Sequence, residues 1–169
     1  QPGKLDMIID LTDILCAGKR TGAIEIEPVN EVVSVSYLWS DGSTQHNRRK
    51  LVAGDYGVIL TDLNNCSVDS TVTLTEPDSI KLKFEVTQPW CADKPDGEIK
   101  LTATGGVDGI NYVYKWSDNS TSDVISDISS GWYSVKVTDL NNCSVRDSVY
   151  VDPLHKTCLI IPNAISPNG

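Results

Sequence analysis

Five cysteines are the residues whose type and spacing most directly imply chemistry: Cys16, Cys66, Cys91, Cys143 and Cys158. Cys16 and Cys66 are 50 residues apart, and Cys91 and Cys143 are 52 apart, in two stretches of similar sequence. Duplicated pairs of this kind are typical of secreted proteins, so we predict the disulfide bonds Cys16–Cys66 and Cys91–Cys143. The alternative is two reduced, buried thiols in each stretch. Cys158 is left to bond with a segment absent from this sequence or to stay free.

Oxygen-bearing side chains gather at two turns and suggest a metal site. The two groups are Asp62, Asn64, Asn65 and Asp139, Asn141, Asn142. Calcium takes six to eight oxygen ligands, whereas each turn supplies three, so a tight hairpin turn alone explains them and calcium stays an open alternative. His155 and Cys158 form an isolated His-x-x-Cys pair without the second pair that a zinc site requires. We expect no bound metal and no cofactor.

The sequence contains no recognisable active-site motif. The patterns GxSxG, HExxH and GxGxxG and the phosphate-binding loop are absent. Its two histidines, His46 and His155, do not occupy equivalent positions in the two similar stretches. Paired carboxylates can perform acid–base catalysis, but positions in turns and on a solvated surface explain the carboxylates here. We therefore expect that the chain is not an enzyme.

Two further groups of side chains could bind a partner. Arg48, Arg49 and Lys50 form the one basic run, which either docks an acidic or sulfated partner or is simply an exposed loop. Trp90 and Trp132 either present a stacking face to a sugar or pack in the core or at a domain junction, and packing is the favoured interpretation.

The overall composition excludes several functional classes. The 169 residues include 14 Lys and Arg against 23 Asp and Glu, for a net charge of −9. This charge disfavours binding to nucleic acid and to anionic membranes. No apolar run approaches the roughly 20 residues of a membrane span. The first residues lack the pattern of a signal peptide. The sequence also has no initiator Met and begins inside a pattern, so we expect it to be a piece of a longer protein.

An internal repeat determines the expected architecture. The segment Thr61–Val68, TDLNNCSV, recurs without change 77 residues later as Thr138–Val145. Each copy alternates apolar and polar residues over short stretches, as in Ile80, Leu82, Phe84 and Val86, which is the period of a half-buried strand. Turn signals recur every 8–12 residues, and one Trp in each copy is placed for the core, a pattern typical of a small β-sandwich.

We therefore predict an all-β chain of two tandem immunoglobulin-like antiparallel β-sandwich repeats. The expected boundaries are residues 1–77 for the first repeat, 78–157 for the second, and 158–169 for a C-terminal segment.

The motifs of both copies resemble the SprB repeat of surface adhesins from gliding Bacteroidota. In the first copy the resemblance rests on Cys16-Ala17-Gly18, Gly22-Ala23-Ile24, Tyr37-Leu38-Trp39-Ser40-Asp41-Gly42, Leu51 to Tyr56, Thr61 to Cys66 and Glu76-Pro77. The second copy matches through Cys91, Gly97-Glu98-Ile99, Tyr114 to Asp118, Ser130 to Tyr133 and Thr138 to Cys143. Asn replaces the usual Gly before Cys66 and Cys143 and after Asp118, and Asn can adopt the positive φ that those turns need.

The last residues resemble a different motif, the start of the C-terminal signal of gliding-motility-associated proteins. These residues are Ile161, Pro162, Asn163, Ala164, Ile165, Ser166, Pro167, Asn168 and Gly169. The resemblance implies export by the type IX secretion system together with an SprF/PorP-like outer-membrane partner. It also implies a location at the cell surface, attached to the outer membrane.

Three short segments resemble the Asp-Ser/Thr-aliphatic acceptor for O-glycosylation in that phylum. Their acceptor residues are Ser70, Ser79 and Ser148. Matches of three residues are frequent by chance, and the chain is rich in Ser and Thr.

The resemblance implies structural stalk repeats of a large adhesin used in surface adhesion and gliding motility, with an unknown surface ligand such as a polysaccharide. The alternative is a spacer or carbohydrate-binding module of a secreted hydrolase. An upstream enzyme domain, or polysaccharide binding that is lost on Trp132→Ala, would distinguish the alternative.

Overall fold

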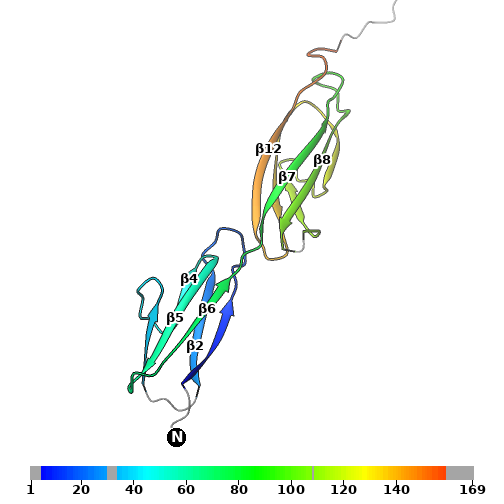
Figure 1. Cartoon of the computed structure of the whole chain (residues 1–169). Coiled ribbons are helices and arrows are strands. Elements are labelled where there is room, and N and C mark those ends of the chain that lie inside the picture. Colours follow the sequence, from blue (N-terminus) through cyan, green and yellow to red (C-terminus); the bar gives the residue numbers. More distant parts are fainter. Residues whose placement is uncertain (1–4, 30–33, 108, 159–169) are drawn as a thin grey trace, which may run out of the picture. The chain divides into compact units, whose positions relative to one another are not determined.

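The computed structural model of the chain describes residues 5–29, 34–107 and 109–158. These residues form strands, turns and loops but no helix, and hence no helix that could cross a membrane. The chain divides into two compact units, Gln1–Ser79 (unit 1) and Ile80–Gly169 (unit 2). Figure 1 shows the strands of each unit.

Each unit contributes six strands from the described residues. Those of unit 1 are β1 (Asp6–Thr12), β2 (Gly22–Val29), β3 (Val35–Trp39), β4 (Arg48–Leu51), β5 (Gly54–Asp62) and β6 (Ser67–Leu74). Those of unit 2 are β7 (Asp78–Thr87), β8 (Gly97–Gly106), β9 (Val113–Trp116), β10 (Val124–Ile128), β11 (Gly131–Thr138) and β12 (Ser144–Val151).

Two three-stranded sheets form each unit. Unit 1 has the orders β1-β2-β4 and β3-β5-β6, and unit 2 repeats them as β7-β8-β10 and β9-β11-β12. The strand pairs are antiparallel. These orders correspond to the A-B-E and C-F-G sheets of an immunoglobulin-like sandwich that lacks the fourth strand of its first sheet. The predicted fold class, two tandem immunoglobulin-like sandwiches, is confirmed.

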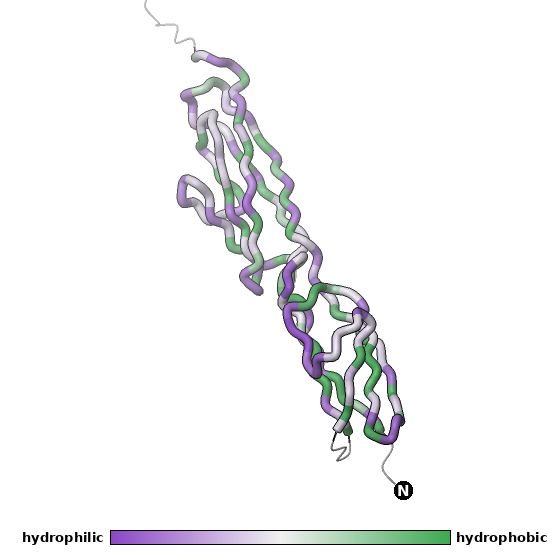
Figure 2. Tube along the Cα trace, turned by 90° about the vertical axis from the view of Figure 1, so that its left-hand side faces the viewer, coloured by the Kyte–Doolittle hydropathy of each residue, from purple (hydrophilic) through white to green (hydrophobic). Residues whose placement is uncertain are grey.

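Alternating side chains from the two sheets meet in a separate core in each unit. Figure 2 shows hydrophobic and hydrophilic residues alternating along the strands. The fully buried residues of unit 1 include Ile24, Ile26, Trp39, Val58, Leu60 and Leu74. Those of unit 2 include Ile99, Leu101, Trp116, Val135, Val137 and Val151. The buried residues of each unit come from both of its sheets. Burial of the two inner faces therefore holds the sheets together.

One tryptophan lies at the centre of each core, as the repeat predicts. Trp39 and Trp116 are each 2% exposed. Each indole N–H donates to a backbone carbonyl oxygen, from Trp39 to Gln45 at 2.7 Å and from Trp116 to Ser122 at 2.9 Å. The ring therefore contributes its apolar area without leaving a buried donor unpaired.

The alternation fails at two strand ends. Leu11 and Val86 continue the inward series of β1 and β7, yet they are 45% and 36% exposed. Both residues are the last but one of their strand.

The hairpin turns have the backbone that their sequence predicts. Asn65 and Asn142 have φ of 63° and 62°, and Asn119 has φ of 71°. Asparagine tolerates this left-handed region better than most residues. The substitution of Asn for Gly in these motifs therefore leaves the turns intact.

Candidate functional surfaces

The cysteine pairing differs from the prediction in both units. Cys91 is bonded to Cys158, not to Cys143, across a sequence separation of 67 residues. Cys66 is a free, exposed thiol, so the predicted bond from Cys16 to Cys66 is not formed. Cys16 and Cys143 are not free thiols. Both predicted pairs are therefore wrong.

The sandwich topology gives the physical reason. In unit 1 the β1–β2 loop, which carries Cys16, lies beside the end of β6, because the amide of Ile14 donates to the carbonyl oxygen of Thr75 at 3.0 Å. Cys66 immediately precedes β6 and so lies at the other end of that strand. Eight residues of β6 span about 27 Å, which is far beyond the reach of a disulfide. The same separation holds between Cys91 and Cys143 along β12.

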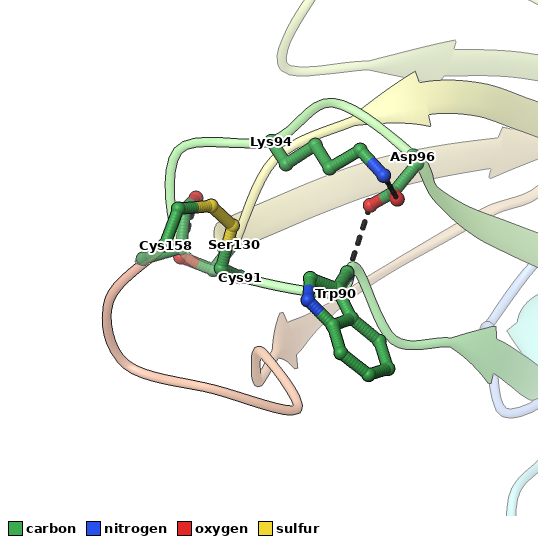
Figure 3. The surroundings of a disulfide bond; sticks show 7 residues. Trp90, Cys91, Lys94, Asp96, Ser130 and Cys158 are labelled. Atoms are coloured by element: carbon green, nitrogen blue, oxygen red, sulfur yellow. Dashed lines mark hydrogen bonds and ion pairs between the residues drawn. A yellow bond between two sulfur atoms is a disulfide. The ribbon is translucent and has the colours of Figure 1, made fainter. Parts of the chain in front are cut away.

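Cys158 lies at the correct end of unit 2 to reach Cys91. The chain that leaves β12 runs beside the β7–β8 connection, where the amides of Leu154 and His155 donate to the carbonyl oxygens of Pro89 and Trp90, each at 2.9 Å. Figure 3 shows Cys158 joined to Cys91 at the end of this segment. We call residues 152–158 and their contacts with residues 89–91 the C-terminal clasp.

Polar contacts order the loop that holds the clasp. Asp96 accepts the backbone amide of Trp90 at 2.9 Å and pairs with Lys94 at 2.7 Å (Figure 3). The hydrogen bond from Lys94 is the main cause that lowers the pKa of the Asp96 carboxyl below its ordinary value. Cys91 itself is fully buried. The β7–β8 loop that carries Cys91 is therefore held by its own polar contacts as well as by the disulfide bond.

The clasp also changes the interpretation of the His155 and Cys158 pair. Cys158 is engaged in the disulfide, so it is not available as a thiolate ligand for a metal. The ring of His155 packs against that of Trp90, with centroids 4.5 Å apart. Among the described residues, no three His, Cys, Asp or Glu side chains are grouped so that they could hold a metal ion.

The carboxylates of the two repeated turns bind backbone amides. Oδ1 of Asp62 accepts the amides of Asn64 and Cys66, each at 2.8 Å. Asp139 repeats these two contacts, and its Oδ2 accepts the amide of Val107 at 3.1 Å. These contacts favour the interpretation of both groups as turn-forming residues, because the lone pairs that a calcium ion would use are directed at N–H donors.

The basic run lies on β4, and its two arginines are paired. Arg48 makes two contacts with Asp41, at 3.1 and 2.7 Å, and its guanidinium lies 5.2 Å from the ring centroid of Trp39. Arg49 pairs with Glu25 at 2.5 Å. The two carboxylates neutralise part of the positive charge of Arg48 and Arg49. This makes the basic run a less favourable docking site for an acidic partner.

Two of the four tryptophans are exposed instead of packed in a core. Trp132 is 70% exposed and Trp90 is 57% exposed. Trp132 stands directly opposite Tyr150 on the β11–β12 pair, with ring centroids 5.3 Å apart. Packing in a core is therefore wrong for both side chains, whereas packing at a domain junction stays a prediction. Within unit 2 the aromatic pair of Trp132 and Tyr150 lies on the surface.

The three candidate acceptor serines all lie on strands. Ser79, on β7, and Ser148, on β12, are exposed, whereas Ser70, on β6, is half-buried. The predicted signal residues Ile161 to Gly169 lie outside the described residues.

Two partnerships were not predicted from the sequence, that of Cys158 with Cys91 and that of Tyr150 with Trp132. The signals for both were present. An immunoglobulin-like sandwich places its first loop and the end of its last strand at the same end, as it does the β7–β8 loop and the end of β12. The hairpin centred on Asn141 sets Trp132 opposite Tyr150.

Comparison with solved structures finds matches at low identity. The extracellular domains 3–5 of Drosophila OTK share 13% identity over 91% of this chain and 62% of that chain, with a TM-score of 0.40. Murine CEACAM1b shares 13% over 88% of this chain and 100% of that chain, with a TM-score of 0.34. Fibronectin(III)-like modules of Clostridium thermocellum CbhA share 14% over 88% and 95%, with a TM-score of 0.32. No curated protein matches the chain.

The comparison with protein families is more specific. The SprB repeat family matches residues 8–44 and 84–121. The first match covers β1 to β3 from the third residue of β1 onward, and the second covers the end of β7 through β9, so the same part of each sandwich is matched. One match in each unit supports the assignment of this chain as an SprB-repeat protein.

Proposed function

We propose that the two units are stalk repeats of a large cell-surface adhesin that serves surface adhesion and gliding motility. The observation that carries this proposal is the pair of SprB matches, one in each immunoglobulin-like unit. The bond between Cys91 and Cys158 in unit 2 is suited to an extracellular location, where disulfides persist. On this view the repeats supply length and resistance to unfolding, and no residue is catalytic.

We further propose that residues 161–169 begin a type IX secretion signal that engages an SprF/PorP-like outer-membrane protein. The support is the resemblance of Ile161 to Gly169 to that signal. The position of the clasp is consistent with this role, because it anchors the preceding residues to unit 2 through Cys158. The protein would then be attached to the outer membrane at the cell surface.

O-glycosylation at Ser79 and Ser148 is part of the same proposal. Both side chains are exposed and therefore open to a modifying enzyme, whereas the half-buried Ser70 is the weaker acceptor. Intact-mass analysis of the native protein tests this point: added hexose on Ser79 or Ser148 supports it, and an unmodified mass contradicts it.

The decisive experiment is affinity purification from native envelopes with the complete C-terminal region as bait. Recovery of an SprF/PorP-like barrel together with a very large repeat-containing parent supports the adhesin. A matched bait that ends at Cys158 should lose the barrel, because it lacks the proposed signal. Recovery of the barrel by both baits would contradict the assignment of residues 161–169.

The second candidate function is a spacer or carbohydrate-binding module of a secreted hydrolase. The exposed aromatic pair of Trp132 and Tyr150 favours it, since such rings can stack on sugars. Recovery of a modest-sized parent with an upstream hydrolase domain in the same experiment would establish this alternative over the adhesin.

A further inference from the structure

We propose that the outer face of sheet β9-β11-β12 binds an anionic polysaccharide. This inference deepens the adhesive role proposed above and rests on it for its biological meaning, because it names the chemical class of the surface ligand. The site consists of a row of three cations, Lys115, Lys136 and Arg146, and the aromatic pair Trp132 and Tyr150. Ser148 lies between Arg146 and Tyr150 on β12, so the site is open in protein that carries no glycan on Ser148.

The strand register places the three cations side by side. Lys136 on β11 stands directly opposite Arg146 on β12 and directly opposite Lys115 on β9. Opposed residues on neighbouring strands have Cβ atoms about 5 Å apart, and like charges in this arrangement repel one another. The row is therefore unfavourable for the isolated fold.

No carboxylate compensates this row. Over the described residues, none of the three side chains takes part in an ion pair, whereas Arg48, Arg49, Lys83 and Lys94 each do. The outward positions of the sheet are Val113, Lys115, Trp132, Ser134, Lys136, Thr138, Ser144, Arg146, Ser148 and Tyr150. None of them is acidic, although the chain contains 23 Asp and Glu. An anionic ligand would supply the missing countercharge.

A shallow hollow lies beside the cations. Lys115, Lys136 and Arg146 line it together with Ser117 and Ser134, and its volume is about 460 Å³. The small serine side chains leave room between the charged row and the aromatic pair, and their hydroxyl groups can donate to or accept from a polar ligand.

The aromatic pair identifies the ligand as a polysaccharide. The faces of exposed Trp and Tyr rings pack against the apolar C–H face of a sugar ring by dispersion. Trp132 and Lys136 are four residues apart on one face of β11, which is about 13 Å. A ligand that touches both must carry rings and negative groups along an extended chain, as an acidic polysaccharide does.

Unit 1 provides an internal comparison for this face. The residues 77 positions earlier in the sequence, Leu38, Ile59 and Asp69, replace the three cations and line a hollow of about 450 Å³. Asp55 and Thr73 replace the aromatic pair and hydrogen-bond to each other at 2.6 Å. The same fold therefore exists without the cations and without the rings, so neither feature is required to form the sandwich.

The test measures the affinity of the full chain for four soluble polymers. Alginate carries carboxylates, heparin carries sulfates, dextran is neutral, and polyphosphate is anionic without sugar rings. We expect binding to alginate or heparin that weakens as salt screens the charges, and no binding to dextran.

Two triple variants of equal charge separate the site from general electrostatics. Lys115→Gln, Lys136→Gln and Arg146→Gln together should weaken binding about tenfold, as expected from the loss of three exposed ionic contacts. Lys81→Gln, Lys83→Gln and Lys100→Gln together remove the same charge from the other sheet of unit 2 and should leave the affinity unchanged. Equal weakening by both variants, or no weakening by the first, would overturn the proposal.

Trp132→Ala tests the identity of the ligand. It should weaken binding of the anionic polysaccharide but not of polyphosphate, because only the former has rings to stack. Unchanged polysaccharide binding by this variant, or no preference for alginate or heparin over dextran, also refutes the site. None of these substitutions touches residues 161–169, so capture of the outer-membrane partner tests the proposed function independently.

Discussion

Breaking the bond between Cys91 and Cys158 should remove a large part of the unfolding free energy of unit 2. The sharpest perturbation is Cys158→Ser, because Cys158 is exposed and its replacement removes no core packing, whereas Cys91 is fully buried. Cys66→Ser is introduced in both the variant and its reference protein, so that the free thiol of Cys66 cannot exchange with Cys91.

The magnitude follows from the length of the closed loop. Closing 67 residues restricts the unfolded chain by about 4 kcal/mol in the chain-entropy description. Small domains are stable by about 5 to 15 kcal/mol, so the loss is a major part of the total for unit 2. Unit 1 does not contain this bond and should keep its stability.

Hydrogen exchange measures the two units separately. We expect the slowest amides of β8 and β11 to exchange about a thousandfold faster in the variant, which is the ratio that corresponds to about 4 kcal/mol. The amides of β2 and β5 should be unchanged. The amides of Leu154 and His155, which bond to the β7–β8 connection, should lose protection first. Acceleration of the β8 and β11 amides by less than about tenfold would refute the stabilising role of the clasp.

Three further predictions follow from individual side chains. Asp139→Ala should lower the unfolding free energy by about 3 kcal/mol, since it leaves three amides without an acceptor around a buried side chain. Asp62→Ala should lower it by about 1 kcal/mol, because Asp62 is less buried and accepts only two amides. Urea unfolding measures both values, and equal losses would contradict this reasoning. Gly97→Ala should lower the unfolding free energy by about 1 to 3 kcal/mol in the same assay, because the added Cβ would lie 2.9 Å from a backbone carbonyl oxygen of β10. An unchanged unfolding free energy would show that the strand moves without cost to accommodate the methyl group. The hydrogen bonds from Arg48 hold the pKa of Asp41 below its ordinary 3.8, so this pair stabilises the fold at neutral pH and its contribution is lost as the pH falls through the lowered pKa. Arg48→Gln should raise the pKa of Asp41 toward that value in an NMR titration, and an unchanged titration would exclude the ion pair in solution.

The alternation of apolar residues was sufficient to predict the fold because it is a local signal. Each inward stripe, such as Tyr114 and Trp116 on β9, is encoded within a few residues, and the turns are marked by Asn at positive φ. The exposure of Leu11 and Val86 was not predictable from the pattern, since alternation alone does not show where along a strand the burial ends.

The cysteine pairing illustrates a different limit. Equal spacing indicated Cys16 with Cys66, but spacing along the chain says nothing about which end of a sandwich a residue occupies. The predicted immunoglobulin-like sandwich already contained that information, because its first loop and its last hairpin lie at opposite ends. The cation row of Lys115, Lys136 and Arg146 was harder to foresee, since it depends on the register between β9 and β11, which are not adjacent in sequence.

The position of the clasp also determines how unit 2 would respond to mechanical tension. A force that pulls on the chain before β7 and after Cys158 passes along β7 to Cys91 and then crosses the disulfide directly. The residues between the two cysteines, which include β8 to β12, are left out of the load-bearing path. At about 3.4 Å per residue, roughly 230 Å of contour length cannot be extended while the bond is intact. A stalk that contains this unit would therefore resist stretching through a covalent bond, and of the strands of this sandwich only β7, which precedes Cys91, would bear the load.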